Sequence, residues 1–87
     1  MITVEYGIII KEGVEKIKPN AFYLSSALKN VELPQSIAFI GYDAFAYCPE
    51  LSKVKYRGSE DQWSEASISP EWAANSGAYT LVYNYTE

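Results

Sequence analysis

The chain repeats itself at an offset of 23 residues, and this internal repeat limits the possible folds more than any other feature. The aligned pairs are Ile8 and Val31, Ile10 and Leu33, Val14 and Ile37, Ile17 and Ile40, Phe22 and Phe45, and Leu28 and Leu51. A third unit begins at Val54-Lys55-Tyr56, in the register of Val31-Glu32-Leu33. Units that cannot bury an apolar face alone are typical of solenoids, in which each unit stacks on the next. We therefore predict a short solenoid.

Each unit is expected to form one coil of this solenoid. Apolar residues at alternate positions at the start of each unit predict a short strand with one buried face, and strands that recur once per coil lie parallel. The rows that contain Val14 and Ile17 are expected to face the same core. Asn20 and Asp43 are expected to cap a helical turn by accepting from the N–H groups that follow. This turn would direct the two aligned phenylalanines inward, stacked on each other.

The pattern breaks after Tyr56, where a helical segment is predicted. Ser59-Glu60-Asp61-Gln62 has the pattern of a capping box, in which the serine hydroxyl and the glutamine amide satisfy early helix donors. The helix that follows would place Trp63 at the position that Ile17 and Ile40 occupy in the earlier coils.

A second helix and a last strand are predicted further along the chain. Ser69 and Pro70 are residue types that favour a helix start, and Gly77 would end this helix in a left-handed conformation. Alternating residues predict a last strand over 79–85. Residues 57–87 would then form a cap in which two tryptophans cover the apolar face of the last coil.

In these residues the chain resembles the BspA-like leucine-rich repeats. The second unit carries the family's pattern in Val31-Glu32-Leu33-Pro34, Ile37, Ile40-Gly41, Asp43-Ala44-Phe45, Cys48 and Leu51. The first unit departs from it at Lys11, Lys18 and Ser25. The resemblance covers roughly residues 8–85. It implies a right-handed β-α leucine-rich-repeat solenoid with a parallel sheet and a C-terminal helix/strand cap, and it implies protein binding, because family members are often bacterial surface or secreted proteins thought to bind other proteins.

The whole chain is expected to form a single α/β repeat domain over residues 1–87. Residues 1–7 would form an N-terminal strand or cap, because Ile2, Val4 and Tyr6 alternate. Residues 8–30 would form the first repeat, 31–53 the second, and 54–87 a degenerate third repeat with the C-terminal cap.

Composition argues against several classes of function. The sequence has no histidine, so His-based triads, imidazole zinc ligands and the usual near-neutral general base are absent. Its one cysteine, Cys48, cannot form an intrachain disulfide or a thiolate metal site and is expected in the core. Glu60, Asp61 and Glu65 are interpreted as acidic residues that favour a helix N-terminus, not as an acid–base pair. We expect no enzyme activity, no catalytic residue, no cofactor and no metal.

Charge and hydropathy also limit the partners. The net charge of −4 has the wrong sign for gripping phosphates, so no nucleic-acid partner is expected. No stretch approaches the roughly 20 apolar residues of a membrane helix, so no membrane insertion is expected. No export signal is predicted in this chain. The family resemblance suggests the cell surface and the lack of a signal suggests the cytoplasm or a virion, which leaves the localisation open.

Two sets of residues are candidates for binding a protein partner. Ile9, Glu32 and Lys55 stand between the inward positions of their strands and should line up on the outer face of the sheet. Tyrosine combines apolar area with a polar tip and favours contact surfaces, although it can also pad the flanks of a thin solenoid. The tyrosines expected to be exposed are Tyr23, Tyr42 and Tyr47.

Two functions remain open at this point. The first is a non-enzymatic protein–protein interaction module that binds through the sheet face or the flanking tyrosines. The second is a structural or decoration subunit of a larger assembly, such as a phage particle or surface fibre, in which copies of the chain would form a homo-oligomer. The open strand edge at the N-terminal end would favour such self-association.

Overall fold

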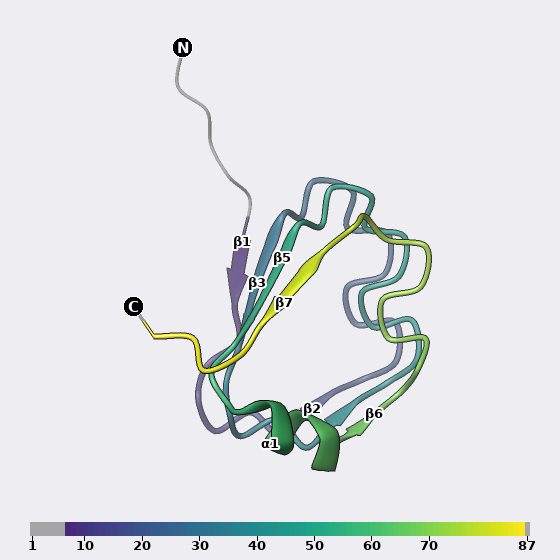
Figure 1. Ribbon diagram of the computed structural model, residues 1–87. Helices are drawn as coiled ribbons and strands as arrows, with labels where there is room; N and C mark the ends of the chain where they lie inside the picture. The colour runs from purple at the N-terminus through teal and green to yellow at the C-terminus, as the bar shows by residue number, and fades with distance from the viewer. Residues whose placement is uncertain (1–6, 87) are drawn as a thin grey trace.

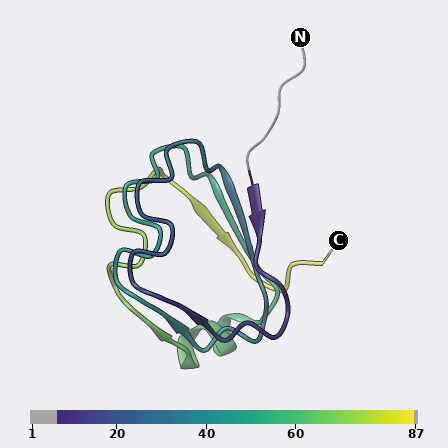
Figure 2. The same cartoon turned by 180° about the vertical axis from the view of Figure 1, so that it is seen from behind.

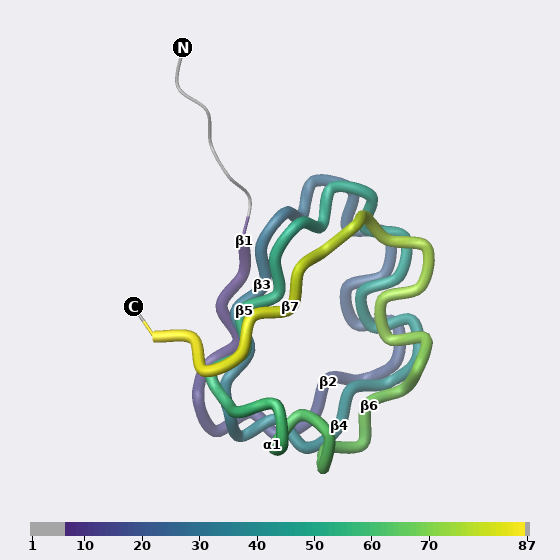
Figure 3. Tube along the Cα trace, in the orientation of Figure 1, coloured from purple at the N-terminus to yellow at the C-terminus, as the bar shows by residue number. Residues whose placement is uncertain are grey.

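The computed structural model describes residues 7–86, which wind into a parallel β-solenoid of about three turns (Figure 1). We call residues 7–29 coil 1, residues 30–52 coil 2 and residues 53–79 coil 3. The elements are β1 (Gly7–Ile9), β2 (Lys16–Ile17), β3 (Asn30–Leu33), β4 (Phe39–Ile40), β5 (Lys53–Tyr56), α1 (Glu60–Glu65), β6 (Ser67–Ile68) and β7 (Thr80–Val82). The coils follow one another closely around a common core, as the view from behind and the Cα trace both show (Figures 2 and 3). The predicted N-terminal strand or cap over residues 1–7 lies outside the described residues except for Gly7, which belongs to β1.

The strands form two parallel sheets, one on each side of the core. The first has the order β1-β3-β5-β7 and the second the order β2-β4-β6. In the first sheet Ile8 pairs with Val31, Val31 with Val54 and Val54 with Leu81. The predicted register of the first three strands is therefore confirmed, and β7 continues it within the range predicted for the last strand.

The core consists of the repeated apolar rows. Phe22 and Phe45 stack with ring centroids 5.0 Å apart and an interplanar angle of 11°, as predicted. Trp72 extends this aromatic row edge-on, 5.8 Å from Phe45. Cys48 is buried, as expected. The fully buried side chains of the middle coil include Val31, Leu33, Ile40, Phe45 and Leu51.

The expected helical turns of the first two coils are absent, because the chain uses turns bonded from coil to coil. Asn20 and Asp43 do not act as helix caps but take left-handed backbone conformations, with φ of 62° and 56°. Asparagine and aspartate tolerate this region better than most residues. The backbone N–H of Phe22 donates to the Ala44 carbonyl at 2.7 Å, a direction that a helix would not allow. Coils 1 and 2 are thus built from strands and turns.

A second strand in each coil, which the sequence analysis did not predict, corrects the placement of Trp63. Ile17 pairs with Ile40, and Ile40 pairs with Ile68. Ile68, not Trp63, therefore continues this row. Trp63 lies on α1 instead, with its ring 5.1 Å from that of Tyr56 and 5.5 Å from that of Trp72.

The capping box of α1 is confirmed, whereas the second predicted helix is wrong. The Ser59 hydroxyl accepts from the Gln62 N–H, and the Gln62 side chain accepts from the Ser59 N–H. Residues 70–75 form turns, and Asn75, not Gly77, takes the left-handed conformation, with φ of 57°. Gly77 is needed for a different reason: a Cβ there would lie 2.6 Å from the carbonyl oxygens of Pro49 and Leu51.

Candidate interaction surfaces

The register of the first sheet brings three predicted residues into one row on its outer face. Ile9 pairs with Glu32, and Glu32 pairs with Lys55. We call these three residues the outer row. Their exposure differs, because Ile9 is 67% exposed, Lys55 is half-buried and Glu32 is only 8% exposed. All three border one hollow of about 250 Å³, so an apolar, an acidic and a basic side chain meet at the same place.

Two further residues order the charged part of this face. Arg57 forms an ion pair with Glu32, which accounts for the low exposure of the carboxylate. The ring of Tyr85 lies 5.1 Å from Lys55 Nζ and 5.4 Å from the Arg57 guanidinium, within the range of cation–π contacts. The outer face is therefore a preorganised surface in which the basic side chains have defined positions.

The three predicted tyrosines are exposed, but only two of them form a cluster. Tyr23 and Tyr47 contact edge-on with ring centroids 5.6 Å apart. Leu24 is 59% exposed and follows Tyr23 directly, and its N–H donates to the Ala46 carbonyl beside Tyr47. We call Tyr23, Leu24 and Tyr47 the tyrosine patch. Tyr42 is 55% exposed and lies at the start of the turn that Tyr47 ends.

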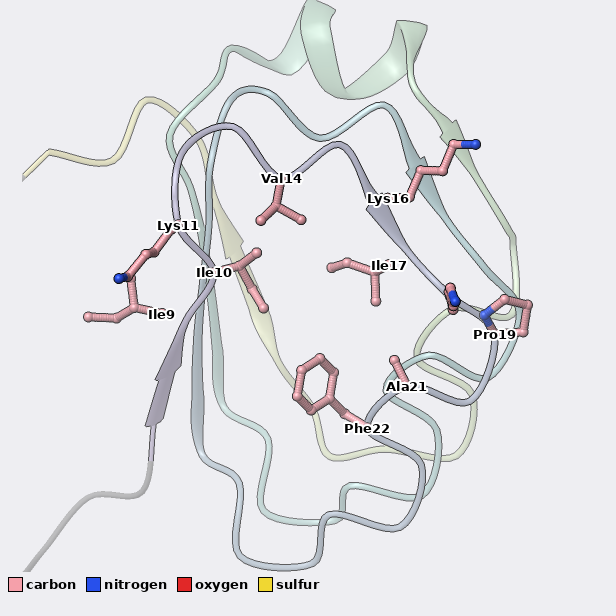
Figure 4. A pocket seen from close by; sticks show the side chains of 10 residues that line it. Ile9, Ile10, Lys11, Val14, Lys16, Ile17, Pro19, Ala21 and Phe22 are labelled. Atoms are coloured by element: carbon pink, nitrogen blue, oxygen red, sulfur yellow. The ribbon is translucent and has the colours of Figure 1, made fainter.

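A third surface is the open end of coil 1, where the sequence predicted an open strand edge but not an apolar hollow. Val14 was expected in the core but is 37% exposed, because no coil covers it from the N-terminal side within residues 7–86. Figure 4 shows the side chains of Ile10, Val14, Ile17 and Phe22 pointing into this end. They line a hollow of about 750 Å³, which we call the end hollow.

Cys48 is the buried thiol of the described residues. Burial raises the pKa of the Cys48 thiol, which favours the neutral form over the nucleophilic thiolate. The Cys48 Sγ lies 3.4 Å from the Phe22 carbonyl oxygen, to which it donates. In residues 7–86, no group of three or more acidic, cysteine or histidine side chains is placed to hold a metal ion. The described helix is too short to cross a membrane.

Two of the three surface residues that were not predicted could have been found from the sequence. Arg57 stands two positions after Lys55, directly after the end of β5, so a period of two continued by one residue would have placed it on the same face. Leu24 aligns with Tyr47 at the repeat offset. Tyr85 had no such signal, because it lies beyond the last strand where the repeat no longer applies.

The fold and its repeated rows define a class, the parallel β-solenoids built from short repeats. A family model described as BspA type leucine-rich repeat region (6 copies) matches residues 5–69. The chain belongs to this family, and the resemblance seen in the sequence is confirmed. Comparisons with curated proteins and with solved structures give no match. Leucine-rich-repeat domains of this family generally serve as protein-interaction modules.

Proposed function

We propose that this chain is a non-enzymatic protein-interaction module that binds its partner through the outer face of the first sheet. The observation that carries this proposal is the outer row: Ile9, Glu32 and Lys55 come from three coils and border a single hollow. Binding surfaces commonly combine an apolar centre with ordered polar groups at the rim. Here Ile9 supplies the apolar contact, and the Glu32–Arg57 pair with Lys55 supplies the charges.

The solenoid suits this role because it holds the outer row on a rigid ladder of backbone hydrogen bonds. Side chains on paired strands have fixed spacing, so little conformational entropy is lost when a partner binds. The tyrosine patch would add a second contact area on the flank of the same coils. We further propose that α1 and β7 cover the C-terminal face of the solenoid.

The proposal is tested by covalent capture followed by a titration. A photo-reactive p-benzoyl-phenylalanine replaces Ile9, which is exposed, and in a control chain it replaces Glu65 on α1. Proteins that crosslink only at position 9 in an extract of the native organism are identified, and the purified partner is titrated against Lys55→Glu. Loss of one charge contact should weaken binding about tenfold, equivalent to about 1.4 kcal/mol.

The control is Ser64→Glu, which adds a carboxylate at an exposed position of α1, outside the residues that line the outer-row hollow and the end hollow. Its affinity should equal that of the wild type. Equal affinities for wild type and Lys55→Glu, or a weakening by both variants alike, would show that the outer row is not the contact.

A further inference from the structure

The open end of coil 1 combines two strand edges with exposed apolar side chains. β1 and β2 are the edge strands of their sheets, so their outward backbone groups have no partner strand within residues 7–86. A second hollow of about 340 Å³, bordered by Ile8, Phe22 and Leu28, adjoins the end hollow at Phe22. Together the two hollows extend across the interior of the coil. Exposed strand edges beside exposed apolar surface are where other chains add.

The contact between coil 1 and coil 2 shows which kind of segment packs on the open face of a coil. Coil 1 covers the equivalent face of coil 2, and the pairing rows are Ile8 on Val31 and Ile17 on Ile40. As a result Val31 is 1% exposed, whereas the equivalent Ile8 in coil 1 is half-buried. In the second row Ile40 is 0% exposed and the equivalent Ile17 stays buried at 4%, so the uncovered apolar surface of coil 1 lies at Ile8 and Val14. The covering segment carries apolar side chains at Ile8, Ile10, Val14 and Ile17, which are positions i, i+2, i+6 and i+9.

The rim of the end hollow adds a charge preference. Lys11, Lys16 and Lys18 are among the lining residues and are exposed, whereas no acidic residue within 7–86 lines the hollow. The two glutamates of this coil, Glu12 and Glu15, lie outside the lining. An acidic segment would therefore be attracted to the rim. Two copies facing each other would oppose lysines to lysines, which disfavours a second copy as the occupant.

We propose that the open end of coil 1 binds an acidic segment of a different protein that carries apolar side chains at positions i, i+2, i+6 and i+9. The segment adds to the edges of β1 and β2 as a further coil, in the manner of strand addition. Its apolar side chains fill the end hollow beside Val14 and Phe22, and its carboxylates lie near the three lysines. This surface differs from the outer row, although Ile9 borders both the end hollow and the hollow beside the outer row.

The test uses labelled peptides and the 87-residue chain. The probe is a fluorescein-labelled copy of residues 7–18 in which Lys11→Glu, Lys16→Glu and Lys18→Glu make the peptide acidic. One control peptide has the same composition in scrambled order, and a second keeps the original lysines. Fluorescence anisotropy should show that the chain binds the acidic probe about tenfold more tightly than either control, and that added salt weakens binding.

Two protein variants locate the binding site. Val14→Glu places a carboxylate in the end hollow and should weaken the probe about tenfold, whereas Lys55→Glu on the outer face should leave its affinity unchanged. The double variant Lys16→Glu/Lys18→Glu changes only exposed side chains and should reverse the preference, so that the lysine peptide binds more tightly than the acidic one. This second variant keeps the test valid if Val14→Glu fails to fold.

Three outcomes would overturn the proposal: no binding of the probe, equal binding of the scrambled peptide, or an unchanged preference in the double variant. Concentration-dependent dimers that Val14→Glu abolishes would also overturn it, because the occupant would then be a second copy. A negative result with the peptides would not contradict the proposal that the outer row binds a partner, because the Lys55→Glu titration tests that surface separately.

Discussion

At the scale of single residues, Tyr56 is the most unusual side chain of the core. It is 1% exposed, and within residues 7–86 its hydroxyl has no hydrogen-bond partner. A Cβ on Gly58 would lie 2.6 Å from this oxygen, so the Tyr56 side chain occupies the space that a side chain at position 58 would need. Burial, followed by the charge of Glu12, raises the pKa of the Tyr56 phenol. The residue therefore contributes apolar packing at the cost of one unsatisfied polar atom.

Tyr56→Phe should stabilise the fold, because it removes the unsatisfied hydroxyl and keeps the ring. The expected gain in the free energy of unfolding is about 1 kcal/mol, measured by urea denaturation at neutral pH. Tyr47→Phe is the matched control, since Tyr47 is exposed, and should change little. A clear loss of stability in Tyr56→Phe would mean that the hydroxyl is bonded in solution.

The same variant carries a pH dependence whose sign follows from the raised pKa. The folded state holds the phenol proton more tightly than the unfolded state, whose pKa is about 10. The contribution of Tyr56 is therefore complete below about pH 10 and is lost as the pH rises through the folded pKa. Tyr56→Phe should lose less stability at alkaline pH than the wild type, and the remaining loss would include Tyr79, whose pKa burial also raises.

At the scale of elements, the strands of the first sheet were predictable and those of the second were not. The apolar residues of β1, β3 and β5 alternate and recur at one offset, so sequence alone aligned Ile9, Glu32 and Lys55. The strands β2, β4 and β6 have two residues each, too few for a period of two to be visible. The outer row was thus predictable, whereas the end hollow required knowledge of which face of coil 1 is uncovered.

The misplacement of Trp63 has a physical cause in the same region. Between Ile17 and Ile40 the offset is 23, whereas between Ile40 and Ile68 it is 28. The extra residues are accommodated where α1 precedes β6, and the repeat offset no longer aligns the sequence with the structure there. Local capping signals still identified α1, because they depend on four adjacent residues only.

Trp63→Ala tests the proposed covering role of α1. The ring contacts Tyr56 and Trp72 at the C-terminal face, so its removal should cost about 3 kcal/mol in the free energy of unfolding and expose apolar surface. Urea denaturation and size exclusion should show lower stability and less soluble monomer. Ser64→Ala, an exposed change on the same helix, should behave as the wild type. Equal behaviour of both variants would contradict the covering role.

At the scale of the whole molecule, the two candidate functions differ in stoichiometry. An interaction module is monomeric until its partner binds, whereas a structural subunit self-associates. We expect light scattering coupled to size exclusion to give a mass near 9.8 kDa at every concentration. A defined multimer would support the subunit of a larger assembly instead.

The direction of the hydrogen bonds between coils has a mechanical consequence. These bonds join strand to strand and turn to turn, so they lie roughly along the axis on which the coils stack. Tension along that axis would load the hydrogen bonds between one pair of coils at a time, so the coils would separate one after another. Tension along a strand would instead shear many of these bonds together. The solenoid should therefore resist a force applied along its strands better than a force applied along the axis on which the coils stack.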